Sequence, residues 1–115
     1  MAADCLFCKI IAGQIPSNKV YEDDRAFAFR DLNPQAPTHI LVVPRKHIPT
    51  LNDLTPDDAP LIGHLHLVAA SLARQEGHAD SGWRAVFNVN AGAGQTVFHI
   101  HLHLVAGRPF KWPPG

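Results

Sequence analysis

The segment TVFHIHLHLV, residues 96–105, carries a histidine at every second position, with apolar residues between the histidines. Because successive side chains of a β-strand point to opposite faces, this alternation predicts a strand over residues 96–106 with all its histidines on one face. Those histidines are His99, His101 and His103. An apolar interior cannot satisfy three imidazoles, so we expect this face to border a cleft or a ligand.

Other apolar patterns predict four more strands and two helices. Runs bounded by turn residues predict strands over residues 19–24, 25–31, 39–44 and 83–90. Helical spacing predicts a long helix from Thr55 to Gly77, and residues 5–13 predict a short one. Short connections favour an antiparallel sheet with the helices on one side. The predicted fold class is α+β: a five-stranded antiparallel sheet with one long helix and a short N-terminal helix.

Composition and charge narrow the class of protein. The 115 residues, of which 46% are hydrophobic, suit a single domain over residues 1–115. Ten basic and ten acidic residues cancel, without the basic clusters that hold a phosphate backbone. The N-terminus lacks the pattern of a signal peptide, and no apolar run approaches the ~20 residues of a membrane span. We therefore expect a cytoplasmic protein that binds neither nucleic acid nor a membrane.

Three interpretations compete for the row of histidines. The first is a wet outer face of the sheet, and the second is a metal site, because His-x-His on a strand suits zinc. The third is catalysis, in which one imidazole reacts while its neighbours position it or move protons. The loop GAGQT, residues 92–96, favours the third, because glycines let backbone N–H groups turn toward a phosphate. The second and third interpretations are compatible if the histidines divide these roles.

The only two cysteines are Cys5 and Cys8, in CLFC. A reducing compartment disfavours a structural disulfide, and no strand precedes the pair as a redox motif would require. Metal binding is therefore favoured over redox chemistry. A pair of plain buried thiols remains an alternative.

The histidine motif resembles the signature of the histidine triad (HIT) superfamily. Further segments resemble its Hint branch, the purine nucleoside phosphoramidases, in order and spacing: FCKIIAGQIPSNKVYEDD, AFRDLNPQAPTHILVVPRKH, GHLHLVA, GQTVFHIHLHLVAGR and WPPG. The resemblance covers nearly the whole chain. It implies a HIT-like fold that hydrolyses the P–N bond of purine nucleoside phosphoramidates, such as AMP–amine adducts, through a nucleotidyl-histidine intermediate.

The resemblance also implies a role for individual residues. His101 matches the nucleophile, His103 the residue that contacts phosphate and protonates the leaving group, and His39 another member of the histidine network. Asp31 matches the carboxylate that binds the ribose hydroxyls, although it could instead be a turn residue. The other nucleotide-binding positions are Phe7, Ile10, Ile15 and Leu32 around the base, Asn88 at the edge, and Gly94, Gln95 and Thr96 near the phosphate. Phe7, Ile10 and Ile15 could equally be ordinary core residues.

Metal-bearing members of the superfamily complete a zinc site with two histidines that match His47 and His99. The resemblance thus implies a structural zinc on Cys5, Cys8, His47 and His99, and no organic cofactor. Purine nucleotides, as AMP or GMP derivatives, are the implied substrates. Two alternatives stay open: a dinucleoside polyphosphate hydrolase, and a nucleotide-binding regulatory partner whose activity is incidental.

A homodimer is expected from two features of the sequence and from Hint relatives. The tail AGRPFKWPPG, residues 106–115, holds two aromatic residues among three prolines and is too apolar for a free end. The long helix carries Leu67 and Ala70 outside its main apolar stripe, and a second stripe requires a second partner. The competing interpretation is that the tail folds back over its own sheet.

Overall fold

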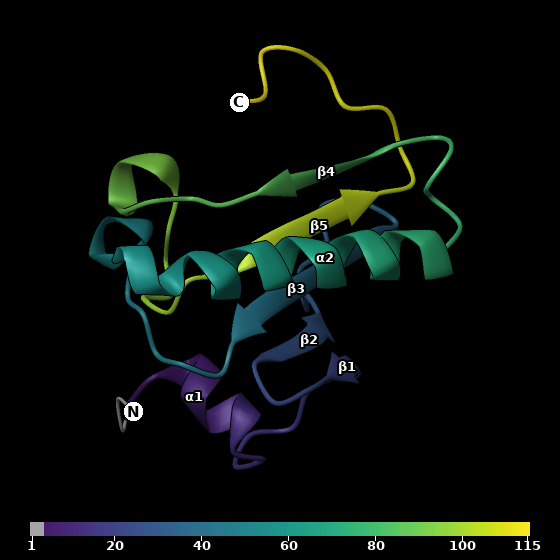
Figure 1. Cartoon of the computed structure of the whole chain (residues 1–115). Coiled ribbons are helices and arrows are strands. Elements are labelled where there is room, and N and C mark those ends of the chain that lie inside the picture. Colours follow the sequence, from purple (N-terminus) through teal and green to yellow (C-terminus); the bar gives the residue numbers. More distant parts are fainter. Residues whose placement is uncertain (1–3) are drawn as a thin grey trace.

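The computed structural model describes residues 4–115 and contains a five-stranded antiparallel sheet (Figure 1). Along the sheet the strand order is β1-β2-β3-β5-β4. The strands are β1 (Lys19–Glu22), β2 (Ala26–Arg30), β3 (Thr38–Pro44), β4 (Trp83–Val86) and β5 (Leu102–Ala106). The helices are α1 (Leu6–Ile11) and α2 (Ala59–Gln75), with 3₁₀ turns at Leu51–Asp53, Pro56–Asp58 and Ala91–Ala93. The predicted α+β class is confirmed.

The two helices cover opposite faces of the sheet. Leu65, Val68 and Leu72 of α2 pack on the face that carries Ala28, Ile40, Val42, Leu102 and Leu104. Phe7, Cys8 and Ile10 of α1 pack on the other face, against Phe27, Phe29, Leu41 and Val43. The prediction that both helices lie on one side is therefore wrong. Every residue of β3 is buried, and a strand that is apolar on both faces must be covered on both.

The last strand is shorter than its pattern predicts. β5 starts at Leu102 rather than at residue 96, and β4 ends at Val86 rather than at residue 90. The ladder between β3 and β5 stops near Pro44, which has no N–H to donate. Before Leu102 the chain bonds elsewhere, since the N–H of Ile100 donates to the carbonyl of Ile48 at 2.8 Å. The predicted faces are nevertheless correct, because Ile100, Leu102 and Leu104 are buried as expected.

Helix α2 begins after a capped 3₁₀ turn rather than directly at Thr55. Asp58 accepts a hydrogen bond from the backbone N–H of Thr55 at 2.9 Å, and the α-helix follows from Ala59. At its other end Gly77 has φ +86°, where the chain turns as predicted. No helix within residues 4–115 is long and apolar enough to cross a bilayer. Residues 1–3, which belong to the segment examined for a signal peptide, lie outside the described residues.

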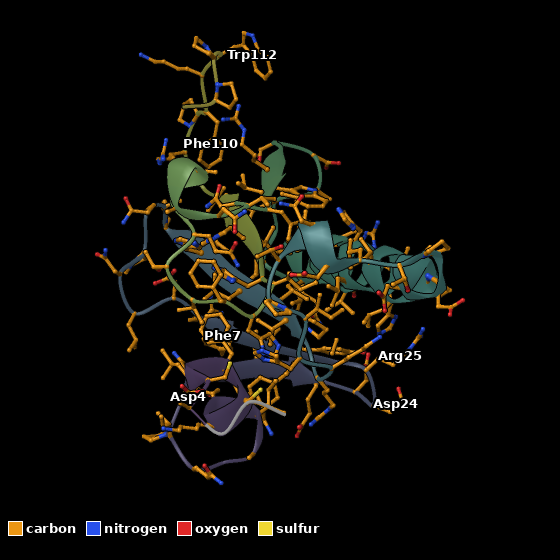
Figure 2. All side chains as sticks on the ribbon, turned by 90° about the vertical axis from the view of Figure 1, so that its left-hand side faces the viewer. Asp4, Phe7, Asp24, Arg25, Phe110 and Trp112 are labelled. Atoms are coloured by element: carbon orange, nitrogen blue, oxygen red, sulfur yellow. The ribbon has the colours of Figure 1, made fainter. Side chains whose placement is uncertain are left out.

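The C-terminal tail leaves the sheet at Gly107. This residue has φ +96°, and a Cβ there would lie 2.9 Å from Cβ of Pro37, so only glycine fits. Figure 2 shows Phe110 near the body of the protein and Trp112 farther out along the tail. The side chain of Trp112 is 84% exposed. The tail thus continues directly from the strand that carries His103.

Candidate active site and metal site

The three histidines of the row lie on the face of the sheet covered by α1. Phe7 of α1 contacts His99 and His101, with ring centroids 6.0 and 5.0 Å apart. The centroids of His101 and His103 are 4.9 Å apart. His39 on β3 pairs with Val105 and is a diagonal neighbour of His103, which pairs with Leu41. The structure therefore brings His39, which is predicted only through the resemblance, together with His101 and His103 in one cluster.

The ring of His101 is held in one tautomer by the backbone. Its Nδ1 lies 2.8 Å from the carbonyl oxygen of His99, and a carbonyl only accepts, so Nδ1–H is the donor. A neutral imidazole carries one N–H, which leaves the lone pair on Nε2. Burial lowers the pKa of His101 below its usual value of 6.5, which keeps the ring neutral at pH 7. A neutral imidazole with a lone pair on Nε2 is equipped to act as a nucleophile.

His39 and His103 form a second ordered pair. The backbone N–H of Gln35 donates to Nδ1 of His39 at 3.0 Å, so the proton of a neutral His39 is on Nε2. That Nε2 lies 2.9 Å from Nδ1 of His103 and donates to it. His103 must then carry its own proton on Nε2. Burial, with His101 and His39 as neighbours, lowers the pKa of His103 to about 4, which makes the neutral form dominant. This series of hydrogen bonds starts at the backbone N–H of Gln35 and passes through His39 to His103. It therefore ends at Nε2–H of His103, a donor beside His101.

Asp31 supports this network from the end of β2. Its Oδ2 lies 3.4 Å from Nε2 of His39, and its Oδ1 accepts from the backbone N–H of Asn33 at 2.8 Å. Asp31 is therefore a turn residue, as its alternative interpretation held, and also a carboxylate next to the histidines. Burial lowers the pKa of His39, while the charge of Asp31 opposes that shift.

The loop before the histidine row is built around Gln95. Its amide nitrogen donates to the carbonyls of Pro49 and Val97, at 2.8 and 3.1 Å, and its Oε1 accepts from the backbone N–H of Asn90 at 2.8 Å. The buried side chain thus ties the loop together. Gly94 has φ +91°, and Thr96 is exposed and offers its hydroxyl to solvent. The structure places these residues directly ahead of His99.

The predicted base-binding residues are only partly brought together. Phe7 and Ile10 belong to the apolar cluster beneath α1, and Ile15 packs against it. Leu32 lies outside that cluster and its side chain is 95% exposed. The cluster also contains Phe29, whose ring centroid is 5.5 Å from that of Phe7. Sequence reasoning missed Phe29, although its alternation with Ala28 on β2 could have indicated a role on this face.

A cleft of about 370 Å³ opens on the other side of His103, toward β4. Asn88, which the resemblance places at the edge of the site, lines this cleft. The remaining lining comes from the loop before β3, from β3, β4 and β5, and from the tail: Gln35, His39, Arg84, Val86, His103, Val105, Arg108, Phe110, Lys111, Pro113, Pro114 and Gly115. The sequence did not reveal the basic residues of this cleft.

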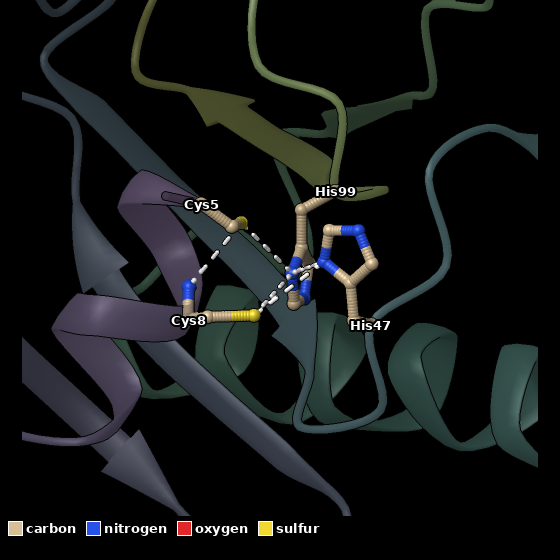
Figure 3. A group of neighbouring side chains, drawn as sticks. All are labelled: Cys5, Cys8, His47 and His99. Atoms are coloured by element: carbon tan, nitrogen blue, oxygen red, sulfur yellow. Dashed lines mark hydrogen bonds between the residues drawn. The ribbon is translucent and has the colours of Figure 1, made fainter. Parts of the chain in front are cut away.

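Cys5, Cys8, His47 and His99 converge on a common point (Figure 3). Nδ1 of His99 lies 3.5 Å from Sγ of Cys5 and 3.6 Å from Sγ of Cys8. Nδ1 of His47 lies 3.4 Å from Sγ of Cys8 and 3.2 Å from Nδ1 of His99. Cys8 of α1 and Cys5, the N-cap residue directly before this helix, supply the sulfur atoms. The segments after β3 and before β5 supply the imidazoles.

These separations match a tetrahedral metal site. Zinc with Zn–S of about 2.3 Å and Zn–N of about 2.05 Å holds sulfur and nitrogen ligands about 3.6 Å apart, and two nitrogens about 3.3 Å apart. Nε2 of His99 donates to the carbonyl of Pro44 at 2.7 Å, which leaves Nδ1 unprotonated toward the cluster. Burial lowers the pKa of His99 to about 4, so the ring is neutral, as a ligand must be. The four residues can therefore hold a metal ion.

Comparison with known proteins gives one consistent family. Residues 4–110 match the family described as scavenger mRNA decapping enzyme C-term binding. The chain is 53% identical, over the full length of both proteins, to an uncharacterized HIT-like protein of Synechocystis. It is 50% identical to the purine nucleoside phosphoramidase of Escherichia coli K12, over 95% of this chain and 92% of that protein.

Solved structures agree with these relatives. A HIT family hydrolase from Legionella pneumophila superimposes with a TM-score of 0.96 at 54% identity, over 97% of this chain and all of that one. A histidine triad protein from Clostridium difficile gives a TM-score of 0.93 at 46% identity, over 96% of each chain. The fold, the ordered histidine cluster and these relatives lead to one conclusion: the chain belongs to the histidine triad (HIT) family, whose matched members include hydrolases.

Proposed function

We propose that this protein hydrolyses the P–N bond of purine nucleoside phosphoramidates through a nucleotidyl intermediate on His101. The observation that carries the proposal is the bond from Nδ1 of His101 to the carbonyl of His99, which directs the lone pair of a neutral ring to Nε2. The name of the E. coli relative, which is 50% identical, supports the choice of a phosphoramidate.

The reaction follows from the two tautomers. Nε2 of His101 attacks phosphorus while the P–N bond breaks, and the departing nitrogen takes the bonding electron pair and a proton that comes from solvent by way of Nε2–H of His103. His103 thus ends this step in the neutral form in which it began. Water then attacks the phosphorus and the bond to Nε2 of His101 breaks; the proton of that water returns to solvent by the same route, which releases the nucleoside monophosphate and restores both histidines. The covalent intermediate divides one difficult displacement into two easier ones.

The remaining site residues surround this centre in the proposal. Asp31 binds the ribose hydroxyls through a carboxylate that already faces His39. Gln95 shapes the loop whose Gly94 backbone and Thr96 hydroxyl bind the phosphate. The base lies against the apolar side of α1, and Asn88 lies at the edge of the nucleotide site, in the cleft. The residues assigned to the base are Phe7, Ile10, Ile15 and Leu32.

Turnover of an adenosine phosphoramidate by the parent and by His101→Ala tests the proposal. Loss of the nucleophile should lower kcat by several orders of magnitude and leave substrate binding largely intact. His66→Ala is the matched control, because His66 is an exposed histidine on α2 outside the cluster. Near-normal turnover in His101→Ala would refute the mechanism. Faster turnover of a diadenosine polyphosphate by the parent would favour the polyphosphate hydrolase instead.

We also propose that the metal held by the Cys/His cluster is one structural zinc. The ligand separations and the unprotonated Nδ1 of His99 support it. Bound zinc would tie α1 to the segment that carries His101, and every ligand position would be filled by protein, as in closed structural sites. Thiolate ligands require a reducing compartment, which supports a cytoplasmic location.

A homodimer completes the proposal. β4 is an edge strand of the sheet. Leu67 on α2 is 71% exposed. Trp112 is 84% exposed on the tail. An unpaired edge next to exposed apolar side chains is the surface that a second copy of the chain would cover. The whole chain would then act as one HIT domain per subunit.

A further inference from the structure

The cleft between His103 and the tail lies where a leaving group would project. His101 has Phe7 on one side and His103 on the other. An in-line displacement places the leaving group on the side of phosphorus opposite His101, within reach of the proton donor His103. Val86 of β4 pairs with His103, so the cleft extends from this donor toward β4 and away from α1.

The charge of this cleft is strongly biased. Arg84, Arg108 and Lys111 line it. The sequence contains ten acidic residues, yet no acidic side chain lines the cleft, where the three cations share the lining with only the main-chain carboxylate of Gly115. Within residues 4–115 none of the three cations forms an ion pair. Because the chain has a net charge of zero, this excess of positive charge is a local feature.

Two of these cations are fixed by partners that carry no charge. The ring of Phe110 lies 5.3 Å from the guanidinium of Arg84 and 4.4 Å from that of Arg108. Arg84 also donates to the carbonyl of Lys111 at 3.0 Å, and Arg108 donates to the carbonyl of Gln35 at 2.9 Å. An aromatic ring and a carbonyl orient a guanidinium without neutralising it. The cleft is thus preorganised to receive an anion.

We propose that this cationic cleft selects phosphoramidates whose leaving amine carries an anionic group, such as the carboxylate of an amino acid. The inference rests on the proposed function and adds the chemical class of the leaving group. Even at the dielectric constant of bulk water, a carboxylate about 7 Å from one cation gains roughly threefold in affinity. The three cations together should therefore favour such a substrate by at least about tenfold at low salt.

The test compares three adenosine phosphoramidates whose leaving amines differ only at the far end. They are 5-aminopentanoate, its carboxamide and 1,5-diaminopentane. The long spacer keeps the reactivity of the P–N bond nearly equal, so differences in kcat/KM report on the far end. The parent should prefer the carboxylate over the carboxamide by about tenfold, and the carboxamide over the cation. The preference should shrink as ionic strength rises.

Lys111→Glu is the main variant, because Lys111 accepts a hydrogen bond from Arg84 through its backbone carbonyl, and a change of its side chain leaves that bond and the stack on Phe110 in place. It should reduce the preference for the carboxylate over the carboxamide severalfold. The variant Arg84→Gln, Arg108→Gln, Lys111→Gln should abolish the preference. Arg74→Glu is the control: Arg74 is exposed in the last turn of α2, and the carboxylate preference should remain.

Each outcome separates the two proposals. Equal kcat/KM for the carboxylate and the carboxamide in the parent would overturn the inference while the proposed function stands. A preference that survives in the triple variant would also overturn it. Turnover of none of the three would refute the proposed function itself. A different result is that the parent hydrolyses diadenosine tetraphosphate faster than all three phosphoramidates and loses this advantage in the triple variant. That result would assign the cleft to a phosphate chain and overturn the proposed preference for a carboxylate.

Discussion

Removal of the metal should lower the stability of the fold much more than it lowers the catalytic rate of the protein that remains folded. Four separations among the ligand atoms already match those of a tetrahedral site, so we expect binding without a large rearrangement of the folded chain. An ion that binds only the folded state at a free concentration 100 times its Kd stabilises it by about 2.7 kcal/mol. In a chain of 115 residues, each kcal/mol shifts Tm by about 4 °C. Chelation should therefore lower Tm by about 10 °C.

The assay is thermal unfolding under reducing conditions, with and without a chelator, for the parent and for Cys8→Ser. The variant should melt near the temperature of the chelated parent and should not respond to the chelator. Metal analysis of the purified parent should give about one zinc per chain. Amide exchange should show where the effect lies, with faster exchange in α1 than in α2. A parent that is metal-free, with two titratable thiols and an unchanged Tm after chelation, would refute the account.

Three further predictions follow from the site and the surface. With the parent, replacing ribose by a dideoxy sugar should remove most of kcat/KM, because the carboxylate of Asp31 is left unpaired without the ribose hydroxyls. With Asp31→Asn the same replacement should cost little more. Equal turnover of both sugars by the parent would remove this role. His103 binds a proton below about pH 4 in the folded state and near 6.5 when unfolded, so the free energy of unfolding should fall as pH drops between these values. Urea unfolding at several pH values should show a weaker dependence in His103→Asn. Light scattering at micromolar concentration should give a dimer, and a fully active monomer would contradict that prediction.

The alternation of the histidine segment was sufficient to predict the faces of the sheet, because the side-chain period of a strand is two. It could not predict where the strand begins. The ladder ends where Pro44 offers no N–H and where Ile100 donates to Ile48 instead, and these partners are distant in sequence. The alternation of alanine and phenylalanine on β2 was also visible in the sequence. That both of its faces are buried, one by α1 and the other by α2, became clear only from the structure.

The identity of the site residues was more predictable than their protonation. The sequence itself favoured metal binding by Cys5 and Cys8, but His47 and His99 were assigned as their partners only through the resemblance; the structure places the four residues together. The tautomers depend on three backbone groups, the carbonyls of residues 44 and 99 and the N–H of residue 35. No local pattern encodes these contacts. The cationic cleft depends in the same way on how the tail docks against β4.

The stereochemical course at phosphorus is the most direct test of the nucleotidyl-histidine mechanism. A single diastereomer of an adenosine phosphoramidothioate would be hydrolysed in ¹⁸O-labelled water, and the configuration of the product determined. Attack by His101 followed by attack of water gives two in-line inversions, so the account predicts net retention. A single direct attack of water on the phosphoramidate would give inversion, and inversion would contradict the covalent mechanism.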